Sequence, residues 1–392
     1  MTTARPATIT RPPDADAGRS SPGGTAAGVS AIGASAVDRR GGDSPTQRQT
    51  FGLEELAVVL SHYDLGELTE ICEFPRGSRK APKLIVGTPE QFYLLKRRAR
   101  GRDDPHKVAF CHGIQTHLAE RQFPLPRLIG TRRDGNSMLV HAGRTYELFE
   151  FIQGTSYDGS LGATTEAGRT LALFHKLLAD HEPVYQPSRG SYHGSRSVMA
   201  STNAIPTTLQ RTDPGLDRGA IGRTVQFLAE SYRDATDRVN DAGLNRWPLS
   251  IAHSDWHPGN ALFRGPRVVA VIDYDAARMQ PRIVDAANGA LQFSMIGGDA
   301  AAPEDWPDYL DESRFRRFVR GYDEVPDAVL SRAELRVTPW LMIEALIAES
   351  VIPIASHGVF GKVAGGRFLP MVQRKVRWLQ EHADRLVASV EE

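Results

Sequence analysis

Cysteine is scarce in this chain of 392 residues, which contains only Cys72 and Cys111. Two thiols are too few for a disulfide framework or a cysteine zinc site, which predicts a protein of a reducing compartment. Charge of one sign is not in excess either, because 47 Lys and Arg residues balance 47 Asp and Glu residues. Nucleic-acid-binding proteins usually carry a basic surplus, so the composition predicts no nucleic-acid partner.

Long apolar runs are also lacking. The sequence has no run of about eighteen apolar residues, and its first segment, MTTARPATITRPPDADAGRSS, is broken by proline and charge, unlike a signal peptide. We therefore expect a cytoplasmic protein without a membrane partner. Residues 1–49 contain almost no large apolar residue and cannot bury enough surface to offset the entropy of ordering, which predicts a disordered tail.

The whole sequence is 41% hydrophobic, and the chain after residue 49 is long enough for two lobes. Residues 50–154 are strand-rich. The runs LTEICEF, KLIVGT and QFYLLKRR predict three strands, and SMLVHAG with RTYELFEFIQG predicts a hairpin. The segments FGLEELAVVLSHY and 108–121 have helical spacing.

Residues 155–392 are predicted to be mainly helical. The clearest helices are expected over 340–352, between Pro339 and Pro353, and over 368–390. A polar stretch over 186–215 is expected to be a long surface loop.

Most of the chemistry lies in IAHSDWHPGNALF and the following RVVAVIDYDAARMQPRIVDAAN. Two strands joined by RGPR predict a hairpin, which would gather Asp255, Asn260 and Asp273 around one small volume. Magnesium prefers oxygen ligands and takes one or two carboxylates together with substrate phosphates. The set is typical of phosphoryl transfer from a nucleotide, with Asp255 free to accept or orient the acceptor's proton and His253 bracing the loop.

The pair HSDWHPGN and VIDYD resembles the signature of the aminoglycoside phosphotransferase and choline kinase-like family. These are small-molecule kinases with a protein-kinase-like fold. The resemblance implies a two-lobed α+β protein-kinase-like fold, with a small antiparallel-sheet N-lobe over 50–154 that binds the nucleotide. A larger, mainly helical C-lobe over 155–392 would carry the catalytic loop and the acceptor site.

The same resemblance implies ATP and Mg as cofactors and assigns roles to individual residues. Asp255 would be the catalytic base, Asn260 and Asp273 the metal ligands, and His253 and Asp285 structural supports of the loop.

The resemblance extends into the first lobe. Lys96, in FYLLKRR, would neutralise the α- and β-phosphates, although a solvated basic face is the alternative for this segment. Glu150 and Phe151 resemble the hinge that receives adenine through backbone groups. Gly77 and Ser78, in PRGSRKAPK, would cover the phosphates, but a Gly-x-Gly-x-x-Gly pattern is absent.

One departure from the family concerns the first-lobe helix, which commonly carries a Glu that pairs with the strand Lys. The segment PHKVAFCHGIQTHLAERQF has no Glu in its first two turns, and only Gln115 or Glu120 could substitute. Lys96 would then be held differently, or the nucleotide lobe would be weakened.

Three neighbouring side chains have open roles. His257 is expected to be a turn residue rather than a metal ligand, because no further His-rich segment accompanies it. Asp275 is either a second metal contact or a solvated turn acid. Trp256 either packs under the loop or lines the acceptor site.

The sequence favours a Mg- and ATP-dependent phosphotransferase that transfers the γ-phosphate to a hydroxyl of a small molecule. The alternative is a catalytically weak nucleotide-binding protein with an assembly or regulatory role, like that of spore-coat kinase-like relatives. The missing helix Glu favours this alternative. The absence of an APE-like segment after Asp273 argues against a protein kinase. An Asp-x-Asp phosphatase would carry its strand earlier, in a parallel α/β domain. The acids Glu344 and Glu349 suggest a cationic acceptor. The suggestion is weak, because residues five positions apart do not share one face of a helix well. The acceptor and the oligomeric state stay open.

Overall fold

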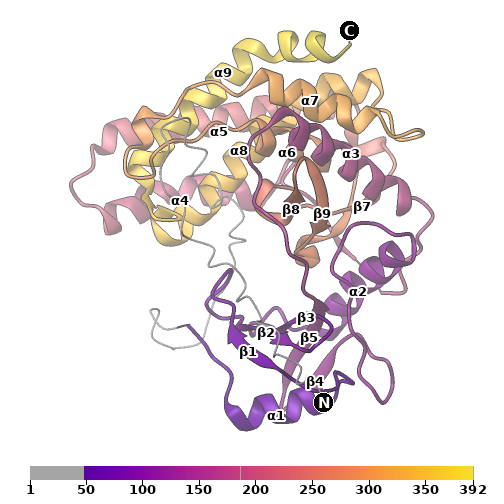
Figure 1. The fold of residues 1–392 in the computed structure, drawn as a ribbon. Coiled ribbons are helices and arrows are strands. Elements are labelled where there is room, and N and C mark those ends of the chain that lie inside the picture. Colours follow the sequence, from indigo (N-terminus) through magenta and orange to yellow (C-terminus); the bar gives the residue numbers. More distant parts are fainter. Residues whose placement is uncertain (1–47, 186, 392) are drawn as a thin grey trace, which may run out of the picture.

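The computed structural model describes residues 48–185 and 187–391, so nearly all of the predicted tail over 1–49 lies outside the described residues. The described chain forms two lobes: an antiparallel sheet at the bottom of Figure 1 and a larger helical lobe above it. This confirms the predicted α+β, two-lobed fold.

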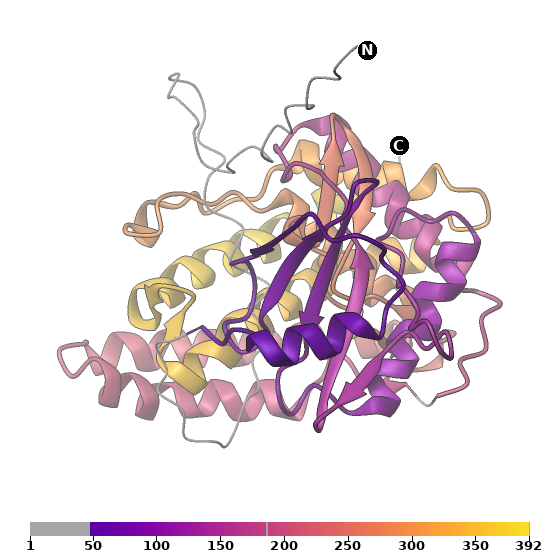
Figure 2. The same cartoon turned by 60° about the horizontal axis from the view of Figure 1, so that its bottom comes forward.

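The N-lobe sheet has five strands in the order β1-β2-β3-β5-β4. All of their pairings are antiparallel. The three predicted strands and the predicted hairpin are present. The strands are β1 (Glu70–Glu73), β2 (Lys83–Gly87), β3 (Phe92–Arg97), β4 (Leu139–His141) and β5 (Arg144–Glu150). The indigo helix α1 (Leu53–Ser61) lies against this sheet (Figure 2). Its Val59 and Leu60 share a core with Leu95 and Leu148, which keeps the sheet's apolar face out of water.

Helix α2 (Pro105–Glu120) connects the two lobes. It begins at the N-cap Asp104, whose side chain accepts hydrogen bonds from the amides of His106 and Lys107, with Pro105 in the first turn. The buried side chains Phe110 and Ile114 belong to the core of the large lobe rather than to that of the sheet. The helix therefore anchors the N-lobe on the C-lobe.

The C-lobe is built mainly from helices; they are α3 (Leu161–Leu177), α4 (Arg196–Thr212), α5 (Arg218–Asp241), α6 (Arg282–Ser294), α7 (Glu312–Asp323), α8 (Arg332–His357) and α9 (Gly365–Glu391). Helices α3 and α7 meet closely, because a Cβ at Gly168 would lie only 2.0 Å from the Phe318 carbonyl oxygen. Seven short strands complete the described part of the lobe: β6 (Ser188–Arg189), β7 (Ser250–Ala252), β8 (Ala261–Arg264), β9 (Arg267–Val271), β10 (Arg278–Gln280), β11 (Val359–Phe360) and β12 (Val363–Ala364).

Two expectations for this lobe were wrong. The stretch over 186–215 is not one long loop, because α4 occupies Arg196–Thr212 and buries Val198, Thr202, Ile205 and Leu209. These residues recur at helical spacing, and burial of this face outweighs the polar composition and Pro206.

Pro339 and Pro353 do not bound a helix but lie inside α8. Packing on the surrounding helices outweighs the missing backbone donors. Among the described helices, α8 alone is long and apolar enough to cross a membrane by length and composition, and 78% of its most apolar window is buried inside the fold.

Candidate active site

The predicted hairpin is present and brings the polar segments together. Strands β8 and β9 pair antiparallel with Ala261 opposite Val271. Just beyond the paired ends, the Ile272 amide donates to the Asn260 carbonyl at 2.9 Å. Asn260 and Asp273 are therefore neighbours at one end of the hairpin.

Asp285 supports the loop that precedes Asp255. Its two carboxylate oxygens accept hydrogen bonds from the amides of His253 at 2.7 Å and Ser254 at 2.9 Å. Ser254 has a φ of 64°, a left-handed conformation that a residue other than glycine rarely adopts. The buried carboxylate of α6 thus stabilises a strained turn, which fits the supporting role expected for Asp285.

His253 also braces the loop, through its backbone amide and through the packing of its ring. The ring lies edge-on to Trp256 with centroids 5.4 Å apart and tilted against Tyr274 at 5.1 Å. Burial lowers the pKa of the imidazole, so the ring is neutral at physiological pH. Trp256 is buried under the loop, the first of its two expected places.

Asp255 faces Asn260. The Asn260 Nδ2 atom donates to the Asp255 Oδ2 atom and to its carbonyl oxygen, both at 2.9 Å. His257 Nε2 lies 3.7 Å from the other carboxylate oxygen. Burial opposes ionisation of Asp255, but His257 and the hydrogen bond from Asn260 outweigh it and hold the pKa below its ordinary value. Asp255 is therefore an ionised acceptor with 23% of its side chain exposed.

Asn260 and Asp273 suit a magnesium ion. The Asn260 nitrogen is engaged by Asp255, which leaves its amide oxygen as an acceptor. Asp273 is exposed, adopts a left-handed backbone with φ 66° and makes no hydrogen bond or ion pair within the described part of the chain. An amide and a carboxylate oxygen, completed by phosphate oxygens and water, form the kind of set that magnesium prefers.

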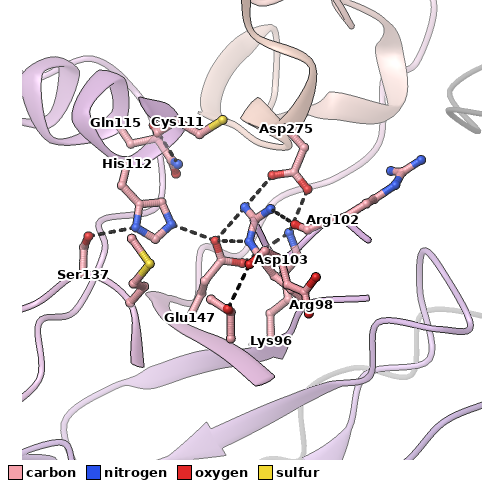
Figure 3. A network of polar contacts seen from close by, with 12 residues as sticks. Lys96, Arg98, Arg102, Asp103, Cys111, His112, Gln115, Ser137, Glu147 and Asp275 are labelled. Atoms are coloured by element: carbon pink, nitrogen blue, oxygen red, sulfur yellow. Dashed lines mark hydrogen bonds and ion pairs between the residues drawn. The ribbon is translucent and has the colours of Figure 1, made fainter. Parts of the chain in front are cut away.

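Lys96 lies at the centre of an ion-pair network between the lobes (Figure 3). Its Nζ atom is 3.4 Å from Glu147 Oε2 and 3.4 Å from Asp275 Oδ2. Arg98 joins the same two acids at 2.7 Å and 2.6 Å. Burial lowers the Lys96 pKa, but Asp275 and Glu147 outweigh it, so the pKa is raised and the lysine stays charged. The alternative of a solvated basic face is therefore wrong.

The alternation of β3 explains this arrangement. Lys96 and Arg98 are two positions apart and share one face, whereas Arg97 points to the other face and pairs with Glu55 at 2.6 Å. Asp275 is not a solvated turn acid, because it links the loop after β9 to both cations. Its other expected role, a second metal contact, stays a prediction.

Glu147 takes the place of the missing helix Glu. It stands directly opposite Lys96 in the β3–β5 ladder and is fully buried. Lys96, Arg98 and His112 outweigh its burial and hold its pKa well below the ordinary value. Gln115 donates to the Cys111 carbonyl instead of reaching Lys96, and Glu120 is exposed at the helix end.

Helix α2 contributes to the network through His112, whose Nε2 atom lies 2.7 Å from Glu147 and whose Nδ1 atom lies 2.8 Å from the Ser137 hydroxyl (Figure 3). A lone acid inside the apolar run TYELF was the signal in the sequence that could have identified Glu147.

Lys83 is a second lysine that the sequence reasoning missed. It is paired directly with Lys96 in the β2–β3 ladder. Burial and then the charge of Lys96 lower its pKa, whereas Asp273 and Asp275 act in the opposite direction. Its Nζ atom lies 2.9 Å from the point that a Cβ at Gly77 would occupy. Gly77, with a φ of 79°, thus covers this ammonium with bare backbone.

The turn that contains Gly77 and Ser78 is held by Arg48, whose guanidinium donates to the carbonyl of Pro75 at 2.8 Å and to that of Ser78 at 3.3 Å. At the hinge, the amide of Glu150 donates to Arg127 and that of Phe151 to Phe92, both at 2.9 Å. These two amides are engaged within the protein, so the expected contact with adenine would have to use carbonyl oxygens or the following residues.

The sequence profile described as the phosphotransferase enzyme family matches residues 71–329. Among curated proteins, a homoserine kinase of Zymomonas mobilis subsp. mobilis is 26% identical over 236 residues, which are 60% of this chain and 68% of that protein. A homoserine kinase of Brucella canis is 28% identical over 222 residues, or 56% of this chain and 62% of that protein. The matched region thus spans less than two thirds of the second relative.

Solved structures share the fold. A microcompartment-associated aminopropanol kinase has a TM-score of 0.59 at 14% identity, covering 86% of this chain and 98% of that chain. An aminoglycoside phosphotransferase from Alicyclobacillus acidocaldarius subsp. acidocaldarius has a TM-score of 0.58 at 18% identity, covering 88% and 98%. An amicoumacin kinase solved with AMP-PNP and Ca2+ has a TM-score of 0.58 at 12% identity, covering 85% and 94%.

Proposed function

The chain belongs to the phosphotransferase enzyme family and is a small-molecule kinase, and from this premise we propose that it transfers the γ-phosphate of ATP, with Mg2+, to a hydroxyl of a small molecule. The observation that carries the proposal is the contact of Asp255 with Asn260 at the end of the β8–β9 hairpin, next to Asp273. Nucleotide use is supported by two proteins of the same fold, the amicoumacin kinase solved with AMP-PNP and a spectinomycin phosphotransferase solved with ADP.

In the proposed reaction the acceptor oxygen attacks the γ-phosphorus and the bond to the β-phosphate oxygen breaks. Asp255 accepts the hydrogen bond from the acceptor hydroxyl and takes its proton as ADP leaves. Its lowered pKa makes it a weak base, so its main contribution is to orient the hydroxyl in line. Asn260 and Asp273 would hold Mg2+, which supplies charge neutralisation at the phosphates when bound.

Three parts of the N-lobe would complete the nucleotide site. Lys96, held by Glu147 and Asp275, would neutralise phosphate charge from the N-lobe side. Gly77 and Ser78 would cover the phosphates with backbone amides, and the segment at Glu150 and Phe151 would receive the adenine. His253 and Asp285 would keep the catalytic loop in the strained conformation that presents Asp255.

The test is phosphate transfer from Mg-ATP to a panel of small hydroxyl acceptors, with Asp255→Asn as the variant. We expect the variant to lose at least a hundredfold in kcat, roughly the contribution of a positioned general base, while its ATP affinity stays unchanged. Asp234→Asn on the exposed face of α5, paired with Arg238, is the matched control. Full turnover by Asp255→Asn would remove Asp255 from the mechanism, and nucleotide binding without any transfer would favour the non-catalytic assembly role instead.

A further inference from the structure

A second carboxylate, Glu349 of α8, lies near the catalytic loop and is half-buried. Gln292 of α6 donates a hydrogen bond to it, and Asn288 of the same helix also contacts it. Between these two amides, Gly289 abuts the loop itself, because a Cβ there would lie 3.0 Å from Trp256 Cδ1. Helix α6 therefore places Glu349 and its two amide partners beside the loop that carries Asp255.

Hydrogen-bond acceptors exceed donors at this place. Gln292 Oε1 and Asn288 Oδ1 have no hydrogen-bond partner among the described residues, although the two side chains are only 2% and 5% exposed. The one charged group of the described chain that shifts the pKa of Glu349 is Asp255, which is another acid. Buried acceptors are normally matched by donors, and even a protonated Glu349 supplies one donor for the two amide oxygens, so the surplus indicates a donor from outside the chain.

Glu344, five residues earlier on α8, shows that the surplus is specific to Glu349. The Glu344 carboxylate is fully buried but satisfied, because His193 Nδ1 lies 2.7 Å away and the Thr236 hydroxyl also donates to it. Pro353, four positions after Glu349, further removes the backbone donor that would normally reach the Glu349 carbonyl.

The oxygen atoms of Glu349, Asn288 and Gln292 suit an ammonium group better than a metal ion. The described residues contain no group of three or more His, Cys, Asp or Glu side chains that could hold a metal. A primary ammonium carries three N–H donors in one compact charge, which match one carboxylate and two amide oxygens. It would also offset the repulsion between Glu349 and Asp255.

We propose that Glu349, with Asn288 and Gln292, binds the ammonium group of an amino-alcohol acceptor and so presents the acceptor's hydroxyl to Asp255. This inference rests on the proposed function for the transfer step, but the binding step stands without it. It narrows the acceptor from any small hydroxyl compound to one that carries a primary amine.

The first experiment measures binding alone. Ligand-detected NMR compares aminopropanol with propanol, and L-homoserine with γ-hydroxybutyrate, on the full chain in the presence of Mg-ADP. The members of each pair differ by the amino group. We expect the amine to bind at least tenfold more tightly than its amine-free partner, as for a hydrogen-bonded charge pair. Equal binding of both members, or no binding of either amine, would overturn the inference.

Variants assign the effect to Glu349. Glu349→Gln keeps the shape and removes the charge, and it should abolish the preference for the amine while leaving ADP affinity unchanged. Glu349→Asp keeps the charge and should retain part of the preference. The matched control Glu344→Gln alters a buried acid of the same helix and should leave the preference intact even if it lowers the melting temperature. A Glu349→Gln protein that still prefers the amine contradicts the assignment.

Transfer from Mg-ATP to the same pairs separates this inference from the proposed function. Amine binding that depends on Glu349, without any transfer, supports the binding site and contradicts the kinase proposal for these acceptors. Transfer to the amine-free members at equal kcat/KM supports the kinase and overturns the ammonium site. With both correct, Glu349→Gln raises KM for the amine by roughly ten- to a hundredfold and leaves KM for ATP unchanged.

Discussion

Lys96 of β3 and Glu147 of β5 face each other across one rung of the N-lobe sheet, with 3.4 Å between Nζ and Oε2. A pairing within the sheet replaces the pairing between helix and sheet that the resemblance implies, and α2 acts only through His112 on Glu147. The position of Lys96 therefore depends on strand register rather than on the placement of a helix. Asp275 adds a link from the C-lobe to the same lysine.

Replacing Glu147 with Gln should impair nucleotide use. Among the described residues, the change leaves Asp275 as the only ion-pair partner of Lys96 and Arg98, and breaking a buried ion pair costs about 3–5 kcal/mol. We expect KM for ATP to rise and kcat to fall, each by roughly tenfold, together with a lower melting temperature. Steady-state kinetics at varied ATP and thermal denaturation measure both effects.

Glu120→Gln is the control, because Glu120 is the helix residue that the sequence offered as a partner for Lys96. It lies exposed at the end of α2, so its replacement should leave both KM and stability unchanged. If Glu120→Gln, and not Glu147→Gln, impairs ATP use, the helix carries the pairing after all.

Replacing Lys83 with Met should separate stability from nucleotide affinity. Like charges directly opposite in a ladder repel, and Lys83 is opposed by Lys96. Without nucleotide, the variant is therefore expected to be as stable as the parent or more so, whereas its KM for ATP rises because a cation below Gly77 is lost. Denaturant unfolding and kinetics measure the two quantities, with the exposed Lys107→Met as control. A destabilised variant with normal KM would assign Lys83 a purely structural role.

The sequence predicted the site residues correctly where those residues lie close together along the chain. The hairpin of β8 and β9 and the residues Asp255, Asn260 and Asp273 lie within about twenty residues, so local pattern was enough to bring them together. Glu147 and Lys83 were missed as site residues, and Glu349 was only weakly indicated, because each acts through a partner from another strand or helix. Strand register and helix packing decide those contacts, and neither can be derived from spacing along the chain.

Replacing Asp285 should loosen the catalytic loop. Asp285→Ala leaves the amides of His253 and Ser254 without their acceptors, at a cost of about 1–3 kcal/mol for each buried donor. Asp285→Asn keeps one acceptor oxygen and should lose less. We expect the unfolding free energy and kcat to decrease in the order parent, Asp285→Asn, Asp285→Ala, with KM for ATP nearly constant. Equal stability of the Ala variant and the parent would show that the loop does not depend on this carboxylate.

The stability of the protein should depend on pH through Glu349. Burial, and then the charge of Asp255, raise the pKa of Glu349 from its ordinary 4.5 to about 8. Between these values the folded chain holds a proton that the unfolded chain has lost, so this group makes the folded state less stable as pH rises through the window. Solvent access to the half-buried side chain makes about 1.4 kcal/mol per pH unit an upper limit.

Glu349→Gln cannot titrate, so its unfolding free energy relative to the parent should increase from about pH 5 to about pH 8. Asp234→Asn on the exposed face of α5 is the control, because Glu344→Gln would also change the titration of His193, whose pKa is raised against the effect of burial by Glu344. Denaturant unfolding without ligand at several pH values measures the difference between each variant and the parent. A difference for Glu349→Gln that stays constant across this range would contradict the raised pKa of Glu349. An added amine acceptor should stabilise the parent most at the alkaline end, where Glu349 is ionised and pairs with the ammonium.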